Sequence, residues 1–124
     1  MQKDFTIILQ DSPGTLADLC EILDEAGVNI EGVCAVTYKG ECPIHILVDD
    51  AQTARKVLED NWINILSEQD VILVKIDDRP GFLAEKAREF AESRINIEVV
   101  YLTTNAKLVF VVDNLKKGHM LFHA

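Results

Sequence analysis

The chain has 124 residues, of which 48% are apolar and 27% are charged, a composition typical of a soluble globular protein. Its 21 acidic and 12 basic side chains give a formal net charge of −9, which makes nucleic acid and anionic membrane surfaces unsuitable partners. No apolar run approaches the ~20 residues of a membrane-spanning helix, and the N-terminal stretch has no basic region followed by a cleavage site. We therefore expect a cytoplasmic protein.

The reactive side chains form no recognisable catalytic or metal-binding pattern. The three cysteines, Cys20, Cys34 and Cys42, form no Cys-x-x-Cys pair. We expect them to be small buried hydrophobic residues in a reducing compartment. His119 and His123 have the i, i+4 spacing of a metal-binding pair, but no third ligand accompanies them. The sequence also lacks the serine-hydrolase, phosphate-loop and dinucleotide fingerprints. These observations predict no catalytic residue, no metal and no cofactor.

In the first half of the chain, strand and helix patterns alternate. Residues 4–10 are rich in β-branched and aliphatic side chains, which predicts a strand. An Asp-x-Pro-Gly turn then starts a helix, in which apolar side chains recur at helical spacing. These side chains are Leu16, Leu19, Leu23 and Ala26. The elements that follow are strands at 28–38 and 43–49, a helix over Ala51–Asn61 and a strand at 62–67.

The second half repeats the first at an offset of 67 residues. Over positions 11–37, 11 of 27 residues are identical without a gap, far more than unrelated segments share by chance. The predicted elements are a strand at 71–77, a helix containing Leu83, Ala87, Phe90 and Ala91, and strands at 95–104 and 107–113. The residues that remain suffice for a helix over Leu115–Phe122 but not for a fourth strand. Gly118 is expected to weaken that helix by ~1 kcal/mol relative to alanine.

Each half therefore reads as a βαββαβ module, and the chain as an α+β protein built from two ferredoxin-like modules. We place the modules at residues 1–68 and 69–124, the second lacking its last strand. In this topology the sheet is antiparallel, both helices cover one face, and the first and third strands are central. The second strand of each module is an exposed edge, which favours pairing with another edge.

The Asp-x-Pro-Gly turn occurs in both modules and can present bare backbone amides. Proline at the first helical position would fix φ, and the glycine after it lets another molecule approach the backbone. The helix N-termini at Gly14–Leu16 and Gly81–Leu83 would favour a carboxylate. The simpler alternative is that Asp11 or Ser12 only caps the helix. Arg79, at the position of Ser12, cannot accept amide hydrogens, so retention of the turn in the second module suggests another role for its backbone.

Asn29 and Asn96 open the second strand of each module, just after the first helix. They are either turn residues that tolerate left-handed geometry or side chains that hydrogen-bond a ligand. A helix end supplies at most ~2 kcal/mol to an anion, whereas micromolar binding needs ~8 kcal/mol. We therefore expect a pocket that a second module closes, with the asparagine of one module near the turn of the other.

The succession of a strand, Asp-x-Pro-Gly-x-Leu, an amphipathic helix and Asn-Ile at a second strand resembles the ACT domain, here in two copies over about residues 4–67 and 71–124. The resemblance implies regulatory modules that bind amino acids at interfaces between domains. It also implies two sets of ligand-contacting residues. The first set is Asp11, Ser12, Gly14, Thr15, Leu16, Asn29 and Ile30, and the second is Asp78, Arg79, Gly81, Phe82, Leu83, Asn96 and Ile97.

The resulting hypothesis is a non-catalytic regulatory protein that forms a homodimer and binds an amino acid or similar small metabolite at the interface between its modules. Its output would pass to a regulated enzyme that the sequence does not identify. The alternative hypothesis is a structural or interaction protein that uses the same edges for oligomerisation without a ligand. Ligand-dependent melting separates the two, because a ligand that binds only the native state adds stability.

Overall fold

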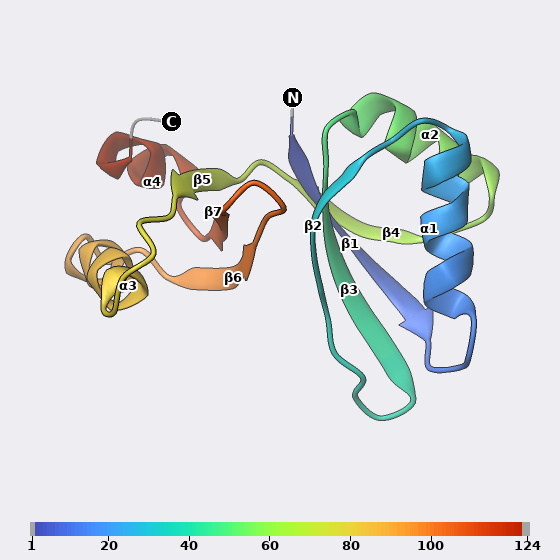
Figure 1. Ribbon diagram of the computed structural model, residues 1–124, viewed down its shortest axis with the longest axis horizontal. Helices are drawn as coiled ribbons and strands as arrows, with labels where there is room; N and C mark the ends of the chain where they lie inside the picture. The colour runs from blue at the N-terminus through green and yellow to red at the C-terminus, as the bar shows by residue number, and fades with distance from the viewer. Residues whose placement is uncertain (1, 123–124) are drawn as a thin grey trace. The chain divides into compact units, whose positions relative to one another are not determined.

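The computed structural model describes residues 2–122, and its Cα positions group into two compact units, Met1–Gln69 and Asp70–Ala124 (Figure 1). We call these units the first and second modules and describe each by itself. The predicted α+β fold, with antiparallel sheets and with helices on one face of each sheet, is confirmed. No helix within residues 2–122 is long and apolar enough to cross a membrane.

The first module contains a four-stranded antiparallel sheet in the order β2-β3-β1-β4. Its elements are β1 (Lys3–Gln10), α1 (Thr15–Glu25), β2 (Ile30–Ala35), β3 (Glu41–Val48), α2 (Ala51–Asp60) and β4 (Ile65–Gln69). As predicted, the first and third strands are central. The strand predicted at 62–67 instead begins at Ile65, because the residues before it form the turn that ends α2.

The second module repeats this plan with a three-stranded antiparallel sheet in the order β5-β7-β6. Its elements are β5 (Ile72–Lys75), α3 (Phe82–Glu92), β6 (Ile97–Leu102), β7 (Lys107–Val112) and α4 (Leu115–Leu121). Strand β5 is the counterpart of β1. Within the described residues no strand takes the place beside β5 that β4 takes beside β1, so β5 is an edge of its sheet.

The core of each module lies between one face of the sheet and its two helices. In the first module, Phe5 and Ile44 of the sheet pack against Leu19 of α1 and Leu58 of α2. In the second module, the core contains an aromatic cluster contributed by α3, β7 and the end of α4. The cluster consists of Phe90, Phe110 and Phe122, with the ring centroids of Phe110 and Phe122 lying 4.8 Å and 4.9 Å from that of Phe90.

The predicted apolar rows of α1 and α3 extend one turn too far. Leu16 and Leu83, which the helical spacing assigns to these rows, are 46% and 48% exposed. Ala91, at the other end of the predicted α3 row, is exposed as well. Each leucine lies at the first turn of its helix, next to the Asp-x-Pro-Gly loop, and outside the core cluster. Their exposure leaves an apolar side chain beside each turn.

Gly118 allows α4 to lie close to the sheet of the second module. A Cβ atom at this position would overlap Cδ1 of Ile72 and lie 3.4 Å from Cγ2 of Val112. The sequence predicted only that glycine weakens the helix. In the folded protein the missing side chain also provides the space in which α4 packs on β5 and β7.

Helices α1 and α3 end in the same left-handed turn. After α1, the Gly27 N–H donates to the Asp24 carbonyl at 2.9 Å and the Val28 N–H donates to the Leu23 carbonyl at 3.0 Å. This hydrogen-bond pair defines the Schellman motif, whose left-handed residue is usually glycine. Gly27 has φ of 74°, whereas Arg94 occupies the equivalent position of the second module with φ of 59°.

We expect Arg94→Gly to raise the free energy of unfolding of the second module by about 0.5–1 kcal/mol. Glycine removes a left-handed strain of ~1–2 kcal/mol, and its greater freedom in the unfolded chain offsets part of that gain. Urea unfolding of the purified variants measures the change. Arg94→Ala is the matched control, because it removes the same charge and keeps the strain. Equal stabilisation by the two variants would contradict this explanation.

Candidate functional site

Each Asp-x-Pro-Gly segment folds as a type II turn that leads into a helix. In the first module, the Thr15 N–H donates to the Ser12 carbonyl at 3.4 Å, with Pro13 and Gly14 at the two central positions. The third position of this turn requires a positive φ, and Gly14 supplies it with φ of 92° and ψ of −14°. The prediction that proline takes the first helical position is wrong, because Gly14 is the N-cap and α1 begins at Thr15.

The second turn has the same form and leaves backbone amides available. The Phe82 N–H donates to the Arg79 carbonyl at 3.3 Å, and Gly81 has φ of 86°. Neither α1 nor α3 has a side-chain cap, so the predicted alternative of a purely capping turn is not realised. Within residues 2–122, no oxygen accepts a hydrogen bond from the backbone N–H of Gly81 or Leu83. These two amides can therefore donate hydrogen bonds to an acceptor from outside the chain.

Different contacts brace the two turns. The Thr15 hydroxyl donates to the Gln10 carbonyl at 2.9 Å and thereby ties α1 to the end of β1. Phe82, at the equivalent position, instead inserts its ring into the core of the second module and is 8% exposed. The Arg79 guanidinium lies 5.4 Å from the centroid of that ring. Phe82 is therefore mainly a structural anchor of the turn, with one part of the ring left at the surface.

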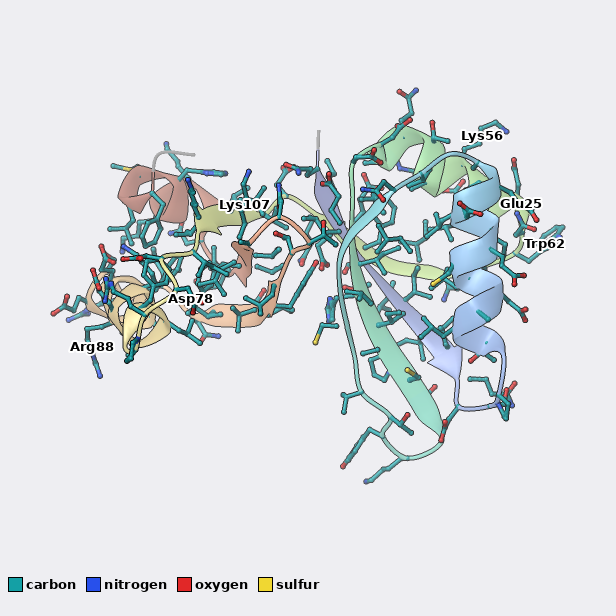
Figure 2. All side chains as sticks on the ribbon, in the orientation of Figure 1. Glu25, Lys56, Trp62, Asp78, Arg88 and Lys107 are labelled. Carbon is teal, nitrogen blue, oxygen red and sulfur yellow. The ribbon has the colours of Figure 1, made fainter. Side chains whose placement is uncertain are left out.

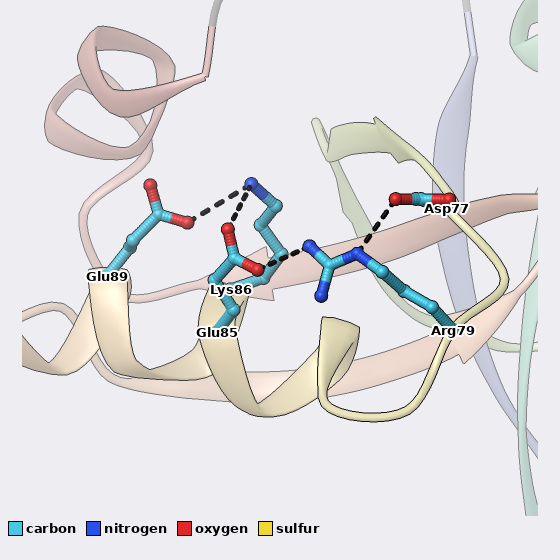
Figure 3. A network of polar contacts seen from close by, with 5 residues as sticks. All are labelled: Asp77, Arg79, Glu85, Lys86 and Glu89. Atoms are coloured by element: carbon cyan, nitrogen blue, oxygen red, sulfur yellow. Dashed lines mark hydrogen bonds and ion pairs between the residues drawn. The ribbon is translucent and has the colours of Figure 1, made fainter.

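Arg79 is held in place by two carboxylates (Figure 3). Its Nε donates to Asp77 at 2.8 Å, and its Nη2 donates to Glu85, in the first turn of α3, at 2.5 Å. The hydrogen bond from Arg79 lowers the pKa of Glu85, and the two carboxylates raise the pKa of Arg79, with Glu85 making the larger contribution. The ion pairs are therefore intact near neutral pH, and they fix the side chain beside the turn.

A pocket of about 450 Å³ lies beside the second turn, within the size range of small-molecule sites. Apolar side chains form most of its wall, and charged groups gather at the turn. The lining consists of Ile76, Asp77, Asp78, Arg79, Phe82, Leu83, Leu102, Thr103, Ala106 and Leu108. The structure thus brings together Asp78, Arg79, Phe82 and Leu83 of the predicted second set. The sequence analysis missed the strand-end leucines at 102 and 108, because only the sheet register brings them to the turn.

The first turn lies beside a hollow with a different lining. This hollow, of about 400 Å³, contacts Thr15 and Asp18 of α1, the end of β1 and the segment between α2 and β4. The other predicted residues of that turn, Asp11, Ser12, Gly14 and Leu16, do not line it. The two turns therefore share a backbone shape but have different surroundings.

Asn29 and Asn96 lie at the opposite end of each sheet from the turn of the same module. Ile30, next to Asn29, pairs with Val48, which in turn faces the start of β1, whereas the turn follows the end of β1. The eight residues of β1 separate the two ends by about 25 Å. Ile30 and Ile97 share this placement. Each Asn-Ile pair can therefore meet a turn only if that turn belongs to another module.

An aspartate that follows the third strand of each module holds the backbone of each asparagine. Asp49 Oδ1 accepts a hydrogen bond from the Asn29 N–H at 3.1 Å, and Asp113 Oδ1 accepts one from the Asn96 N–H at 3.0 Å. The recurrence of aspartate at both strand ends is the sequence signal for this contact. Neither asparagine has a positive φ, so the left-handed alternative is wrong for both.

The cysteines and the described metal-ligating side chains form no further centre. Cys34 is exposed on the edge strand β2, which among the described residues pairs with β3 on one side only, so the prediction of burial is wrong for this residue. Cys20 is partly buried, and this burial, followed by the charge of Glu21, raises the pKa of its thiol. Within residues 2–122, no three His, Cys, Asp or Glu side chains are grouped to hold a metal ion. His123 lies outside the described residues.

The net negative charge of the chain comes entirely from the first module. Residues 1–69 carry 13 acidic and four basic side chains, for a net charge of −9, whereas residues 70–124 carry eight of each. The pocket beside the second turn therefore belongs to a module without net charge. The charges of that module itself therefore exert no net repulsion on an anionic group.

Solved structures of low sequence identity share this fold. A protein from Bacteroides thetaiotaomicron matches with a TM-score of 0.87 and 24% identity, covering 98% of this chain and 85% of that chain. The ligand-free regulatory subunit of aspartate kinase from Thermus thermophilus gives 0.68 and 20%, covering 98% and 92%. Aspartate kinase from Synechocystis gives 0.63 and 22%, covering 98% of this chain and 25% of that chain. No curated protein matches the chain.

The family to which the chain is assigned agrees with its internal duplication. The family model described as an ACT domain pair matches residues 1–122. Its extent covers both sheets, both Asp-x-Pro-Gly turns and all four helices. This protein belongs to the ACT domain pair family.

Proposed function

We propose that this protein is a non-catalytic regulator whose second module binds an amino acid beside the Asp78–Leu83 turn. The observation that carries the proposal is the 450 Å³ pocket, whose mostly apolar wall includes Leu83. The backbone amides of Leu83 and of Gly81, a turn residue that does not itself line the pocket, have no acceptor in the described chain. A helix N-terminus favours a carboxylate through these amides and its dipole. An apolar wall beside it favours a ligand that carries a hydrocarbon group.

The lining of the pocket suggests an amino acid with an aliphatic side chain. The ligand carboxylate would accept hydrogen bonds from the N–H groups of Gly81 and Leu83, and the ammonium would lie near the Asp78 carboxylate. The side chain would pack against Leu102 and Leu108, two of the strand-end residues in the lining. Arg79 is already paired with Asp77 and Glu85, so it would orient the turn rather than hold the ligand as a free cation.

We propose that a second copy of the chain closes the pocket. Leu83 and Leu102 are 48% and 60% exposed, so one module leaves much of the ligand uncovered. The neutral charge of the second module and its exposed β6 edge suit pairing between two copies. The partner copy would then contribute its Asn96 and Ile97, the remaining members of the predicted second set. The first set, Asp11, Ser12, Gly14, Thr15, Leu16, Asn29 and Ile30, would form the corresponding site of the first module.

We base the proposed regulatory role on the family and on the role of one structural relative. The aspartate kinase subunit from Thermus thermophilus is a regulatory subunit with the same fold. We therefore propose that ligand binding changes the dimer and that an enzyme, not yet identified, responds to this change. The rival proposal is an interaction protein whose edges form the dimer without a ligand.

A thermal-shift panel of the twenty amino acids tests the ligand proposal. Leucine, isoleucine or valine should raise the melting temperature, because a ligand at 100-fold its dissociation constant adds ~2.7 kcal/mol to the free energy of unfolding. Leucinol, which lacks the carboxylate, is the matched control ligand and should give no shift. A panel in which no amino acid moves the melting temperature would favour the interaction protein.

A further inference from the structure

The hollow of the first module shares no residue with the pocket of the second module and has its own chemistry. It is bounded by α1, by the end of β1 and by the turn between α2 and β4. The lining consists of Ile8, Leu9, Gln10, Thr15, Asp18, Leu19, Ile22, Trp62, Ile63 and Asn64. Asp18 is the one charged residue of this lining, and no basic side chain contributes to it.

Trp62 forms an exposed wall of this hollow. Its side chain is 94% exposed and projects from the turn after α2 (Figure 2). The Trp62 N–H donates to the Glu59 carbonyl at 3.0 Å and the Ile63 N–H donates to the Leu58 carbonyl at 2.9 Å, which places Trp62 at the left-handed position of a Schellman motif. Its φ of 60° is the geometry that glycine favours. The folded module therefore gains little packing from a large side chain at a strained position, which points to a role in binding.

A strand edge is open on the floor of the same hollow. Strand β4 pairs with β1 only over Asp4–Ile7, although β1 continues to Gln10. Within the described residues, no strand lies beside residues 8–10 on the β4 side. The Gln10 carbonyl already accepts hydrogen bonds from the Thr15 hydroxyl and the Ser12 N–H, so the open part of the edge is at Ile8 and Leu9. An extended polypeptide can add to such an edge through main-chain hydrogen bonds, while pockets on either side take its side chains.

The charge around the hollow selects a basic partner. Helix α1 exposes four carboxylates and contains no basic residue: Asp18, Glu21, Asp24 and Glu25. Elsewhere in the module, Lys3 and Arg55 pair with Glu68, and Lys56 pairs with Asp60. The fourth basic residue, Lys39, lies over the ring of Tyr38 at 5.2 Å and does not line the hollow. A second copy of this module would bring the same net charge of −9 and be repelled, whereas a cationic segment would be attracted.

We propose that the hollow between α1 and Trp62 binds an extended basic segment of a partner protein. An apolar side chain of that segment packs against Trp62 and Ile22, and a lysine or arginine lies beside Asp18. The segment runs along the open edge of β1. This surface shares no residue with the amino-acid pocket of the second module and only Thr15 with the site proposed for the first set, so the two proposals can fail separately.

The single tryptophan of the chain makes the binding directly observable. The probe is a capped synthetic peptide of alternating lysine and leucine, and the control peptide has glutamate in place of each lysine. The lysine peptide should shift the emission of Trp62 to shorter wavelength and protect it from acrylamide, with weaker binding at higher salt. The glutamate peptide should do neither. An unchanged emission with the lysine peptide would overturn the proposal.

Two glycine variants distinguish loss of the binding surface from loss of protein stability. Trp62→Gly should melt at the same temperature as the native chain or higher and should weaken peptide binding, followed with a labelled peptide, by roughly 30-fold. Arg94→Gly is the matched control, because it makes the same left-handed replacement in the second module, and it should leave binding unchanged. Equal losses in both variants would overturn the proposal. A blue shift produced by raising the protein concentration alone would also overturn it, since the occupant would then be a second copy.

Discussion

Replacing Gly81 with alanine should weaken binding of the amino-acid ligand by roughly 10- to 100-fold. At φ of 86° an alanine is strained, and the turn relieves this strain by rotating the Pro80–Gly81 peptide toward the type I form. The rotation turns the N–H of residue 81 away from the ligand carboxylate. A hydrogen bond to a charged group is worth ~1.5–3 kcal/mol, which corresponds to this loss of affinity. Isothermal titration calorimetry with leucine measures it.

The matched control for this substitution is Gly27→Ala in the first module. Gly27 also has a positive φ, and a Cβ atom at either glycine would meet no atom within 4 Å. Both variants should therefore lose similar stability, about 1 kcal/mol, through backbone strain alone. Only Gly81→Ala should lose affinity. If Gly27→Ala weakened binding equally, or Gly81→Ala left it unchanged, the second turn would not be part of the site.

Replacing Gly118 with valine should lower the free energy of unfolding of the second module by about 3 kcal/mol. The new side chain would overlap Cδ1 of the buried Ile72, and overpacking of a close-packed core costs ~1–3 kcal/mol. The higher helix propensity of residues other than glycine offsets only part of this loss. Urea unfolding, followed by circular dichroism, measures the change.

A double-mutant cycle tests whether the contact with Ile72 is the cause. Gly118→Ala alone and Ile72→Val alone should each destabilise the second module by about 1 kcal/mol, through overpacking and a small cavity respectively. The double variant should lose less free energy of unfolding than the sum of the two single losses, by at least about 1 kcal/mol. The reason is that valine lacks the Cδ1 atom that the alanine would overlap. If the two losses were additive, the contact with Ile72 would not be the cause of the destabilisation by Gly118 variants.

The duplication made most of the fold predictable. Two in-register copies of strand, turn and helix determined the predicted order of elements. The start of each helix could not be predicted, because a Pro-Gly pair suits both the first helical turn and the centre of a type II turn. The exposure of Trp62 could not be predicted either, because it depends on where α2 ends and not on the hydrophobicity of the side chain.

The candidate site was predictable at the turn but not around it. Asp78, Arg79, Phe82 and Leu83 line one pocket, as an unbroken motif in the sequence can suggest. The apolar wall includes strand ends that are far from the turn in the sequence, such as Leu102 and Leu108. Their approach to the turn depends on the register of β5, β7 and β6. Spacing along the chain carries no information about that register until the sheet order is known.

The most direct test of the ligand site is an amide NMR titration of this 13.9 kDa chain with leucine. We expect the backbone N–H signals of Gly81 and Leu83 to move most. Both should shift downfield as a carboxylate accepts their hydrogen bonds, and leucinol should move neither. Saturable changes confined to other residues, with these two amides unmoved, would contradict it.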